Sequence, residues 1–222
     1  MEYFKINSLW KRQEYVKDKP KGTHGHLIVG DYSEPEFGNI KHWRVSEKVD
    51  GTNIRIFFNS HLKELHVSFS GRTDNAQLPP HLLEYLQSHF TSERLCSVFK
   101  PDESGRIPSV FLFGEGYGPK IQSGGGNYRK DAGFILFDVI VDNWVLKVED
   151  VKEIALKLEI PMVPDLGVMR ESEIVEFVKS KPMSQCSHVP QMMEGVVCRS
   201  EPLMLFRNRR PVMFKLKCKE FL

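Results

Sequence analysis

Residues 52–58 of the chain read TNIRIFF, with the apolar side chains of Ile54, Ile56 and Phe58 at every second position. This alternation is typical of a β-strand that buries one face. The same alternation returns at 65–69, after a turn that we expect at 59–61. The two stretches therefore predict a β-hairpin.

Strand signals outnumber helix signals along the rest of the chain. Further strands are predicted at 110–117, 134–141, 144–148, 195–199, 203–206 and 212–217, and helices at 81–90, 150–158 and 171–178. Strands with a few inserted helices indicate an α+β fold, which we expect to contain two packed, mainly antiparallel sheets with flanking helices.

The composition restricts the class of protein. The chain has 222 residues, of which 41% are hydrophobic and 27% charged, which allows one sizeable core or at most two small ones and excludes a disordered or fibrous protein. We predict a single domain over residues 1–222. The net charge of +2 provides no bulk attraction to nucleic acids or membranes. The four cysteines form no CxxC pair, and no run of about 18 apolar residues occurs. We expect a soluble, cytoplasmic protein with no membrane partner.

Lys48 lies where a strand is expected to begin, in the segment EKVDGTN at 47–53. A lysine amine has a reference pKa of about 10.4, so it attacks an electrophile only when burial or nearby cations lower that pKa. Lys215 and Lys217 alternate with apolar residues and project from one strand face, where two cations suit a polyphosphate. A merely solvated strand face explains this last pattern equally well.

Two carboxylates lie beside glycines near the ends of predicted strands. Glu115 lies in FGEGYG at 113–118 and Glu194 in MEGVV at 193–197, where glycine leaves room for a ligand. No convincing helix follows the first of these strands, and the chain has no GxxxxGK[ST] motif. Dinucleotide-binding and P-loop folds are therefore excluded.

Six segments, in order, resemble the motifs of the covalent nucleotidyltransferase superfamily of polynucleotide ligases and RNA capping enzymes, and most closely its RNA-ligase-2-like family. They are EKVDGTN at 47–53, SGR at 70–72, FGE at 113–115, FILFDV at 134–139, EGVV at 194–197 and KLK at 215–217. The opening KINSL at 5–9 is also similar to the start of that family. The resemblance implies an ATP-grasp-like adenylyltransferase domain.

The resemblance also implies a role for each matching residue. Lys48 would attack the α-phosphate of ATP to form lysyl-AMP, while Lys215 and Lys217 would neutralise that phosphate and the departing pyrophosphate. The implied nucleotide contacts are the adenine for Glu47, the backbone of Val49 and Phe137, the ribose for Glu115, and the phosphates for Asn53 and Arg72. Glu194 would help to hold Mg²⁺, or Mn²⁺ in its place, through water molecules.

Simpler structural roles stay open for several of these residues. Phe137 lies in an apolar strand and is also suited to a core position. Arg72 follows a glycine, as an exposed turn residue would, and Asp50 can pair with a cation instead of a metal.

Basic residues are concentrated towards the C-terminal end. Residues 199–219 contain seven basic side chains and one acidic side chain. Within this stretch, RNRRP at 207–211 is predicted to form a cationic hairpin loop that follows a phosphate backbone, with a solvated turn as the alternative. Only five residues follow Lys217, so we expect no C-terminal OB domain, and a partner protein that replaces the missing domain.

We therefore expect an ATP- and Mg²⁺-dependent RNA ligase of RNA repair. It would form lysyl-AMP, transfer AMP to a 5'-phosphate and join that end to a 3'-hydroxyl, at RNA ends or nicks. The alternatives are a small ATP-dependent DNA ligase, GTP transfer of the capping type, and a non-catalytic nucleotide- or RNA-binding module on the same fold.

Overall fold

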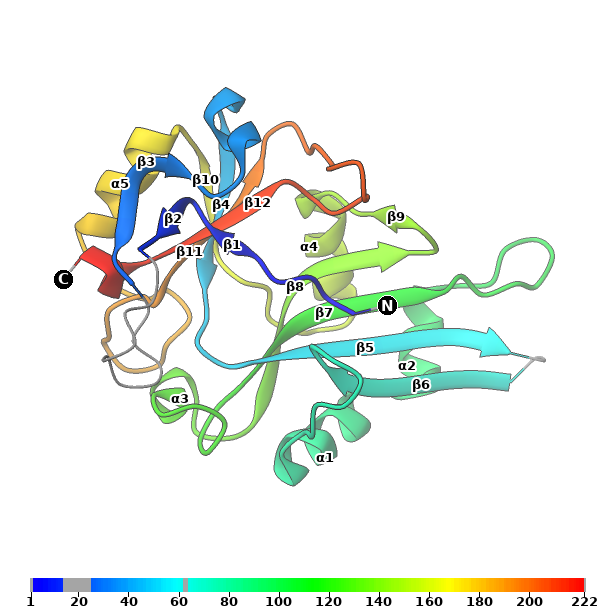
Figure 1. The fold of residues 1–222 in the computed structure, drawn as a ribbon. Helices are drawn as coiled ribbons and strands as arrows, with labels where there is room; N and C mark the ends of the chain where they lie inside the picture. The colour runs from blue at the N-terminus through cyan, green and yellow to red at the C-terminus, as the bar shows by residue number, and fades with distance from the viewer. Residues whose placement is uncertain (1, 14–24, 62–63, 222) are drawn as a thin grey trace. The chain divides into compact units, whose positions relative to one another are not determined.

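The computed structural model describes residues 2–13, 25–61 and 64–221, and the chain packs into two compact units (Figure 1). Unit 1 comprises Met1–Phe4, Val49–Val163 and Cys186–Pro190, and unit 2 comprises Lys5–Lys48, Pro164–Gln185 and Gln191–Leu222. One of the points at which the chain passes between the units lies between Lys48 and Val49. The predicted single adenylyltransferase domain over 1–222 stays a prediction.

Unit 1 is built on a five-stranded antiparallel sheet in the order β6-β5-β7-β8-β9. The strands are β5 (Thr52–His61), β6 (Glu64–Gly71), β7 (Val110–Tyr117), β8 (Gly133–Val141) and β9 (Trp144–Val145). The predicted alternation is confirmed, because Ile54, Ile56 and Phe58 are fully buried in one cluster. The predicted hairpin is the pair β5 and β6.

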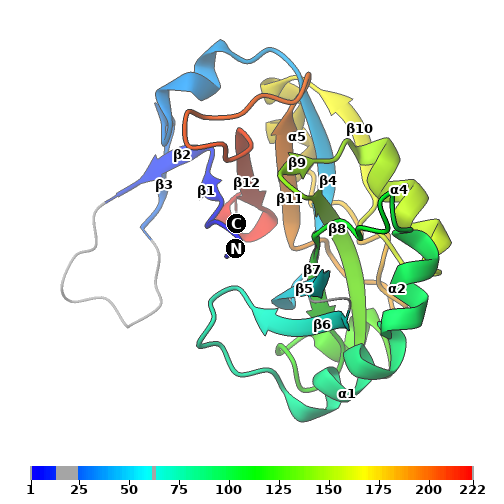
Figure 2. The same cartoon turned by 90° about the vertical axis from the view of Figure 1, so that its right-hand side faces the viewer.

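Three helices cover the apolar face of this sheet (Figure 2). They are α1 (Pro80–His89), α2 (Ser92–Val98) and α4 (Val148–Lys157), while α3 (Gly125–Tyr128) is a single turn. Leu82 of α1, Leu95 of α2 and Val151 of α4 pack into the same core as the sheet residues. Because side chains alternate along a strand, Asn53 and Glu115 project from the opposite face.

Unit 2 contains a second five-stranded sheet, in the order β1-β12-β11-β4-β10. Its strands are β1 (Asn7–Ser8), β4 (Trp43–Lys48), β10 (Asp165–Met169), β11 (Gly195–Ser200) and β12 (Met213–Lys217). The pair of β1 and β12 is parallel and the other three pairs are antiparallel. A separate two-stranded sheet joins β2 (Trp10–Arg12) to β3 (Leu27–Tyr32).

One face of the second sheet carries the core of unit 2. Trp43, Val196 and Phe214 are fully buried there, and Ile174 and Val178 of α5 (Glu171–Lys179) pack against the same cluster. The two 3-10 helices, η1 (Pro35–Asn39) and η2 (Cys218–Phe221), add buried residues to it. The apolar face holds the sheet in place, and the other face is available for polar groups.

The predicted α+β class is confirmed: the described residues form two five-stranded, mainly antiparallel sheets with five α-helices. In the part of the chain that the structure describes, the helices are too short or too polar to cross a membrane.

Three details of the predicted elements were wrong. The turn expected at 59–61 is strand, because Asn59 pairs with His66 and the ladder continues to His61. The strand expected at 144–148 stops at Val145, and Val148 is the first residue of α4. The strand expected at 203–206 is absent from this described segment. There, Leu205 makes one isolated bridge with Pro211, around the turn that the N–H of Arg209 closes on the carbonyl of Phe206.

Candidate functional site

The polar face of the sheet in unit 2 brings three predicted lysines together. Lys48 of β4 and Lys217 of β12 both lie opposite Gly195 of β11. Lys215 lies two residues before Lys217 on β12. The three side chains share one face, because residues two apart on a strand point the same way. The sheet of unit 2 thus places Lys48 and the segment 215–217 on the two sides of one intervening strand.

Glu194 joins two of these lysines. Its Oε2 accepts a hydrogen bond from Lys48 Nζ and its Oε1 accepts one from Lys217 Nζ, each at 2.7 Å. Both pairs are charge-assisted hydrogen bonds, because donor and acceptor are ionised. They are also partly shielded from water, because the Glu194 side chain is only 13% exposed. Gly195 permits this arrangement, because a Cβ there would lie 2.1 Å from the carbonyl oxygen of Leu216.

Lys215 differs electrostatically from a surface lysine. Burial lowers its pKa to about 8, with repulsion from Lys48, Lys217 and Lys5 acting in the same direction. The Glu194 carboxylate opposes that shift. The cluster therefore contains a fourth cation, Lys5, for which no chemical role was predicted.

Glu47 lies on the other face of the strand that carries Lys48. It is 1% exposed, and its carboxylate accepts hydrogen bonds from Ser184 Oγ at 2.5 Å and from the backbone N–H of Gln185 at 2.8 Å. In the structure, Glu47 thus holds residues 184–185 next to β4. Its predicted contact with adenine stays a prediction.

In unit 1, the segment after Lys48 begins with a tightly packed turn. Val49 is buried beside Tyr117, Tyr128 and Ile135, and the backbone N–H of Asp50 donates to Tyr128 Oη at 3.3 Å. A Cβ on Gly51 would lie 2.4 Å from the carbonyl oxygen of Gly116 and 2.7 Å from Glu115 Cγ. Glycine is therefore required at position 51, where the backbone passes against β7.

Asn53 and Glu115 are direct neighbours in unit 1. They are paired residues on β5 and β7 and point from the face opposite the helices. Asn53 Oδ1 is buried, and within the described residues nothing donates a hydrogen bond to it. A buried acceptor without a donor is costly, so this oxygen is suited to a hydroxyl or amine of a ligand.

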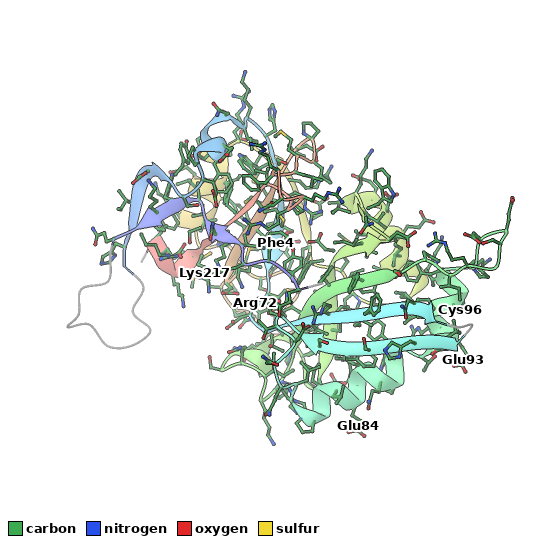
Figure 3. All side chains as sticks on the ribbon, turned by 45° about the vertical axis from the view of Figure 1, so that its right-hand side comes forward. Phe4, Arg72, Glu84, Glu93, Cys96 and Lys217 are labelled. Carbon is green, nitrogen blue, oxygen red and sulfur yellow. The ribbon has the colours of Figure 1, made fainter. Side chains whose placement is uncertain are left out.

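Phe137 and Arg72 are the other predicted site residues of unit 1. Phe137 is half-buried and its ring centroid lies 5.2 Å from that of Tyr3. It lies outside the main core under the helices and packs against the smaller cluster of Val49, Tyr117, Tyr128, Ile135 and Val163, so a packing role agrees with the structure, and the predicted contact with adenine stays a prediction. Arg72 is exposed just after β6 (Figure 3).

Metal ligation rests on one predicted residue. The described residues contain no group of three His, Cys, Asp or Glu side chains that could hold a metal ion. Glu194 supplies hard carboxylate oxygens, which suit Mg²⁺ or Mn²⁺. A metal at Glu194 therefore needs most of its ligands from phosphates and water.

Comparisons with known proteins agree with the motifs. A model of the RNA ligase family matches residues 41–217. The fold is similar to that of a Naegleria gruberi RNA ligase solved with pyrophosphate, with a TM-score of 0.57, 18% identity, and coverage of 82% of this chain and 51% of that chain. A variant of the Naegleria ligase solved with ATP and Mn gives a TM-score of 0.56 at 18% identity, over 80% of this chain and 49% of that chain.

An archaeal ATP-dependent RNA ligase is also similar, with a TM-score of 0.55 and 18% identity over 82% of this chain and 44% of that chain. The chain thus spans about half the length of these solved ligases. No curated protein sequence matches it.

Proposed function

Because the chain belongs to the RNA ligase family, we propose that it is an ATP-dependent RNA ligase that forms a lysyl-AMP intermediate on Lys48. The observation that carries this proposal is the cluster of Lys48, Lys215 and Lys217 around the carboxylate of Glu194. In this proposal, a nucleophile, its proton acceptor and two cations for a polyphosphate gather at one face of the sheet in unit 2.

In the first step, Lys48 Nζ attacks the α-phosphorus of ATP. The ammonium must first lose a proton, and Glu194 Oε2 at 2.7 Å is the acceptor in place. A P–N bond forms, the bond from the α-phosphorus to the bridging oxygen breaks, and pyrophosphate leaves. Lys215 and Lys217 stabilise the charge on the phosphates, since fixed cations in a partly buried site do so without reorganisation.

The proposed nucleotide contacts come from several segments of the chain. Phe137 stacks on the base, Arg72 contacts the phosphates, and the backbone of Val49 and the Glu47 carboxylate read the adenine edge. To do so, the Glu47 carboxylate must give up its hydrogen bond with Ser184 or Gln185 and accept one from the base instead. Asn53, whose buried Oδ1 is an acceptor beside Glu115, fits a ribose hydroxyl better than a phosphate oxygen.

Glu194 would help to hold Mg²⁺ through water, and the ion would supply charge neutralisation for the phosphates. We expect Glu194→Gln to lower the maximal rate of adenylylation, because the proton acceptor of Lys48 is lost, and also to raise the Mg²⁺ concentration for half-maximal adenylylation about ten-fold, because loss of a water-mediated ligand costs roughly that much. A Mg²⁺ titration of the labelling rate measures this. Glu201→Gln, which removes a carboxylate paired with Arg44, is the control, and an unchanged Mg²⁺ requirement would remove Glu194 from the metal site.

Later steps need RNA ends: AMP passes from Lys48 to a 5'-phosphate, and a 3'-hydroxyl then displaces AMP to seal the strand. The predicted cationic loop is a turn, with Arg207 and Arg209 exposed. We propose that it contacts RNA phosphates.

The double variant Arg207→Ala, Arg209→Ala is expected to weaken RNA binding equally for all sequences. The slope of log K against log salt should become shallower by about 1.4, since each phosphate contact with a single strand contributes about 0.7. Filter binding over a salt series measures it, with Lys152→Ala, Lys157→Ala on α4 as the charge-matched control. An unchanged slope would leave this turn as a solvated loop.

The test of the proposed function is label transfer. With α-labelled ATP and Mg²⁺ the chain should become covalently labelled, γ-labelled ATP should leave it unlabelled, and added pyrophosphate should remove the label. RNA binding without any covalent label would favour the non-catalytic module.

Comparing nicked substrates that carry RNA or DNA at the 3'-hydroxyl separates an RNA ligase from a DNA ligase.

A further inference from the structure

The segment Glu2–Phe4, which we call the strap, crosses the face of the unit 1 sheet opposite the helices. Its central residue, Tyr3, is 8% exposed, and its ring centroid lies 4.9 Å from that of Phe113 and 5.2 Å from that of Phe137. Figure 3 shows Phe4 on the side of the sheet away from Glu84 of α1. The strap therefore packs where the nucleotide-binding residues lie.

Tyr3 is also tied to the strand that carries Phe137. Its hydroxyl donates to Asp138 Oδ2 at 2.5 Å, and Asp138 is 3% exposed. A buried carboxylate needs such donors, so the bond fixes the tyrosine ring as well as the strand.

The backbone at Phe137 is irregular, and this irregularity sets the direction of its ring. Phe113 pairs with Asp138 whereas Gly114 pairs with Leu136, so Phe137 is the extra residue of a β-bulge between β7 and β8. A bulge re-aims a side chain and removes it from regular cross-strand packing. The Tyr3 ring is a neighbour of Phe137 in addition to the buried cluster that contains Val49 and Ile135.

At its other end the strap holds the loop that follows β6. The Glu2 carboxylate accepts a hydrogen bond from the backbone N–H of Asp74 at 3.1 Å, and the Asp74 carboxylate pairs with Arg55, which is itself buried. Asp74 follows Arg72 by two residues. One short segment thus touches both the loop of Arg72 and the ring of Phe137.

We propose that the strap is a positioning element for ATP, in which Tyr3 orients Phe137 under the base and Glu2 orients the Arg72 loop towards the phosphates. This role rests on the proposed function, since it assigns both partners to the nucleotide. Neither strap residue touches the reacting atoms, so the strap acts on ATP affinity more than on the rate of the chemical step.

The test compares strap variants with a matched control. Tyr3→Leu removes the ring, Tyr3→Phe removes only the hydroxyl, and Glu2→Ala releases the loop. Phe57→Leu is the control, because Phe57 lies on the same sheet and its ring stacks on that of Phe111, with the centroids 4.5 Å apart. The readouts are the ATP dependence of adenylylation and calorimetric binding of ATP to the same variants in a Lys48→Ala background.

We expect Tyr3→Leu to raise the ATP concentration for half-maximal adenylylation about ten-fold, and Tyr3→Phe and Glu2→Ala about three-fold each, with a change of less than about two-fold at saturating ATP. Phe57→Leu should leave all values near those of the unmodified chain. An equal loss in Phe57→Leu, or no loss in Tyr3→Leu, would overturn the proposal.

The calorimetric readout separates a failure of the proposed chemistry from a failure of the proposed role of the strap. If the chain binds ATP but forms no adduct, the proposed chemistry fails, and weaker binding in Tyr3→Leu still supports the strap. The Lys48→Ala background can fail to bind ATP although the unmodified chain forms the adduct. In that case the ATP dependence of adenylylation in the strap variants decides whether the strap affects ATP affinity. If neither binding nor an adduct is found with the unmodified chain, the strap proposal is overturned as well.

Discussion

Lys48→Arg is expected to abolish covalent labelling of the chain by α-labelled ATP, with a loss of about a thousand-fold or more. Arginine keeps the positive charge next to Glu194, but its guanidinium stays protonated and offers no nucleophilic nitrogen. The variant therefore separates the chemical role of Lys48 from its structural role. Labelling at several time points, with protein resolved by denaturing electrophoresis, measures the loss.

The control for this substitution is Lys219→Arg, which makes the same change at an exposed lysine beyond β12. Its labelling should match that of the unmodified chain. Both variants should unfold within about 0.5 kcal/mol of the unmodified chain, since each keeps its charge. Persistent labelling in Lys48→Arg would show that another residue is the nucleophile.

Lys215→Met is expected to impair adenylylation and to stabilise the fold. Labelling should fall about a hundred-fold, the usual effect of removing one group that stabilises transition-state charge. The free energy of unfolding at pH 7 should rise by about 1 kcal/mol, because the variant removes a partly buried cation that is repelled by Lys48, Lys217 and Lys5. Denaturant unfolding and labelling of one preparation test both effects, and a destabilised but fully active variant would contradict them.

The lowered pKa of Lys215 also sets a pH dependence. Between pH 8 and the ordinary lysine value, the unfolded chain binds more protons at this residue than the folded chain, so its contribution to stability rises with pH across that window. Adenylylation at low ATP should change in the opposite direction, falling above about pH 8 as Lys215 loses its charge. Both dependences should be weaker in Lys215→Met.

Much of the fold follows from local patterns, whereas most of the candidate site residues come from the resemblance of the motifs to the family and stay predictions. The alternation at Ile54, Ile56 and Phe58 identified a central strand because one face of that strand is fully buried. The spacing of Lys215 and Lys217 correctly placed both cations on one face, because strand geometry alone decides it. The family was identified from the order of the motifs, and the family model matches residues 41–217.

What the local patterns missed depends on contacts between distant segments. The contacts of Glu194 with two lysines come from strand register, which brings Lys48 and Lys217 to opposite sides of Gly195. Lys5 joins this cluster because β1 pairs with β12 at Ser8 and Lys215. The strap could not be predicted from the sequence, because its hydrogen bonds to Asp74 and Asp138 join residues that are 72 and 135 positions apart. Such separations are far longer than the repeat of a helix or a strand.

The most direct test of the central claim is an intact mass spectrum of the unmodified chain after incubation with ATP and Mg²⁺, followed by peptide mapping. The account predicts one adduct of the mass of AMP on the peptide that contains Lys48, reversed by pyrophosphate. The absence of an adduct, or an adduct on a different residue, would contradict it.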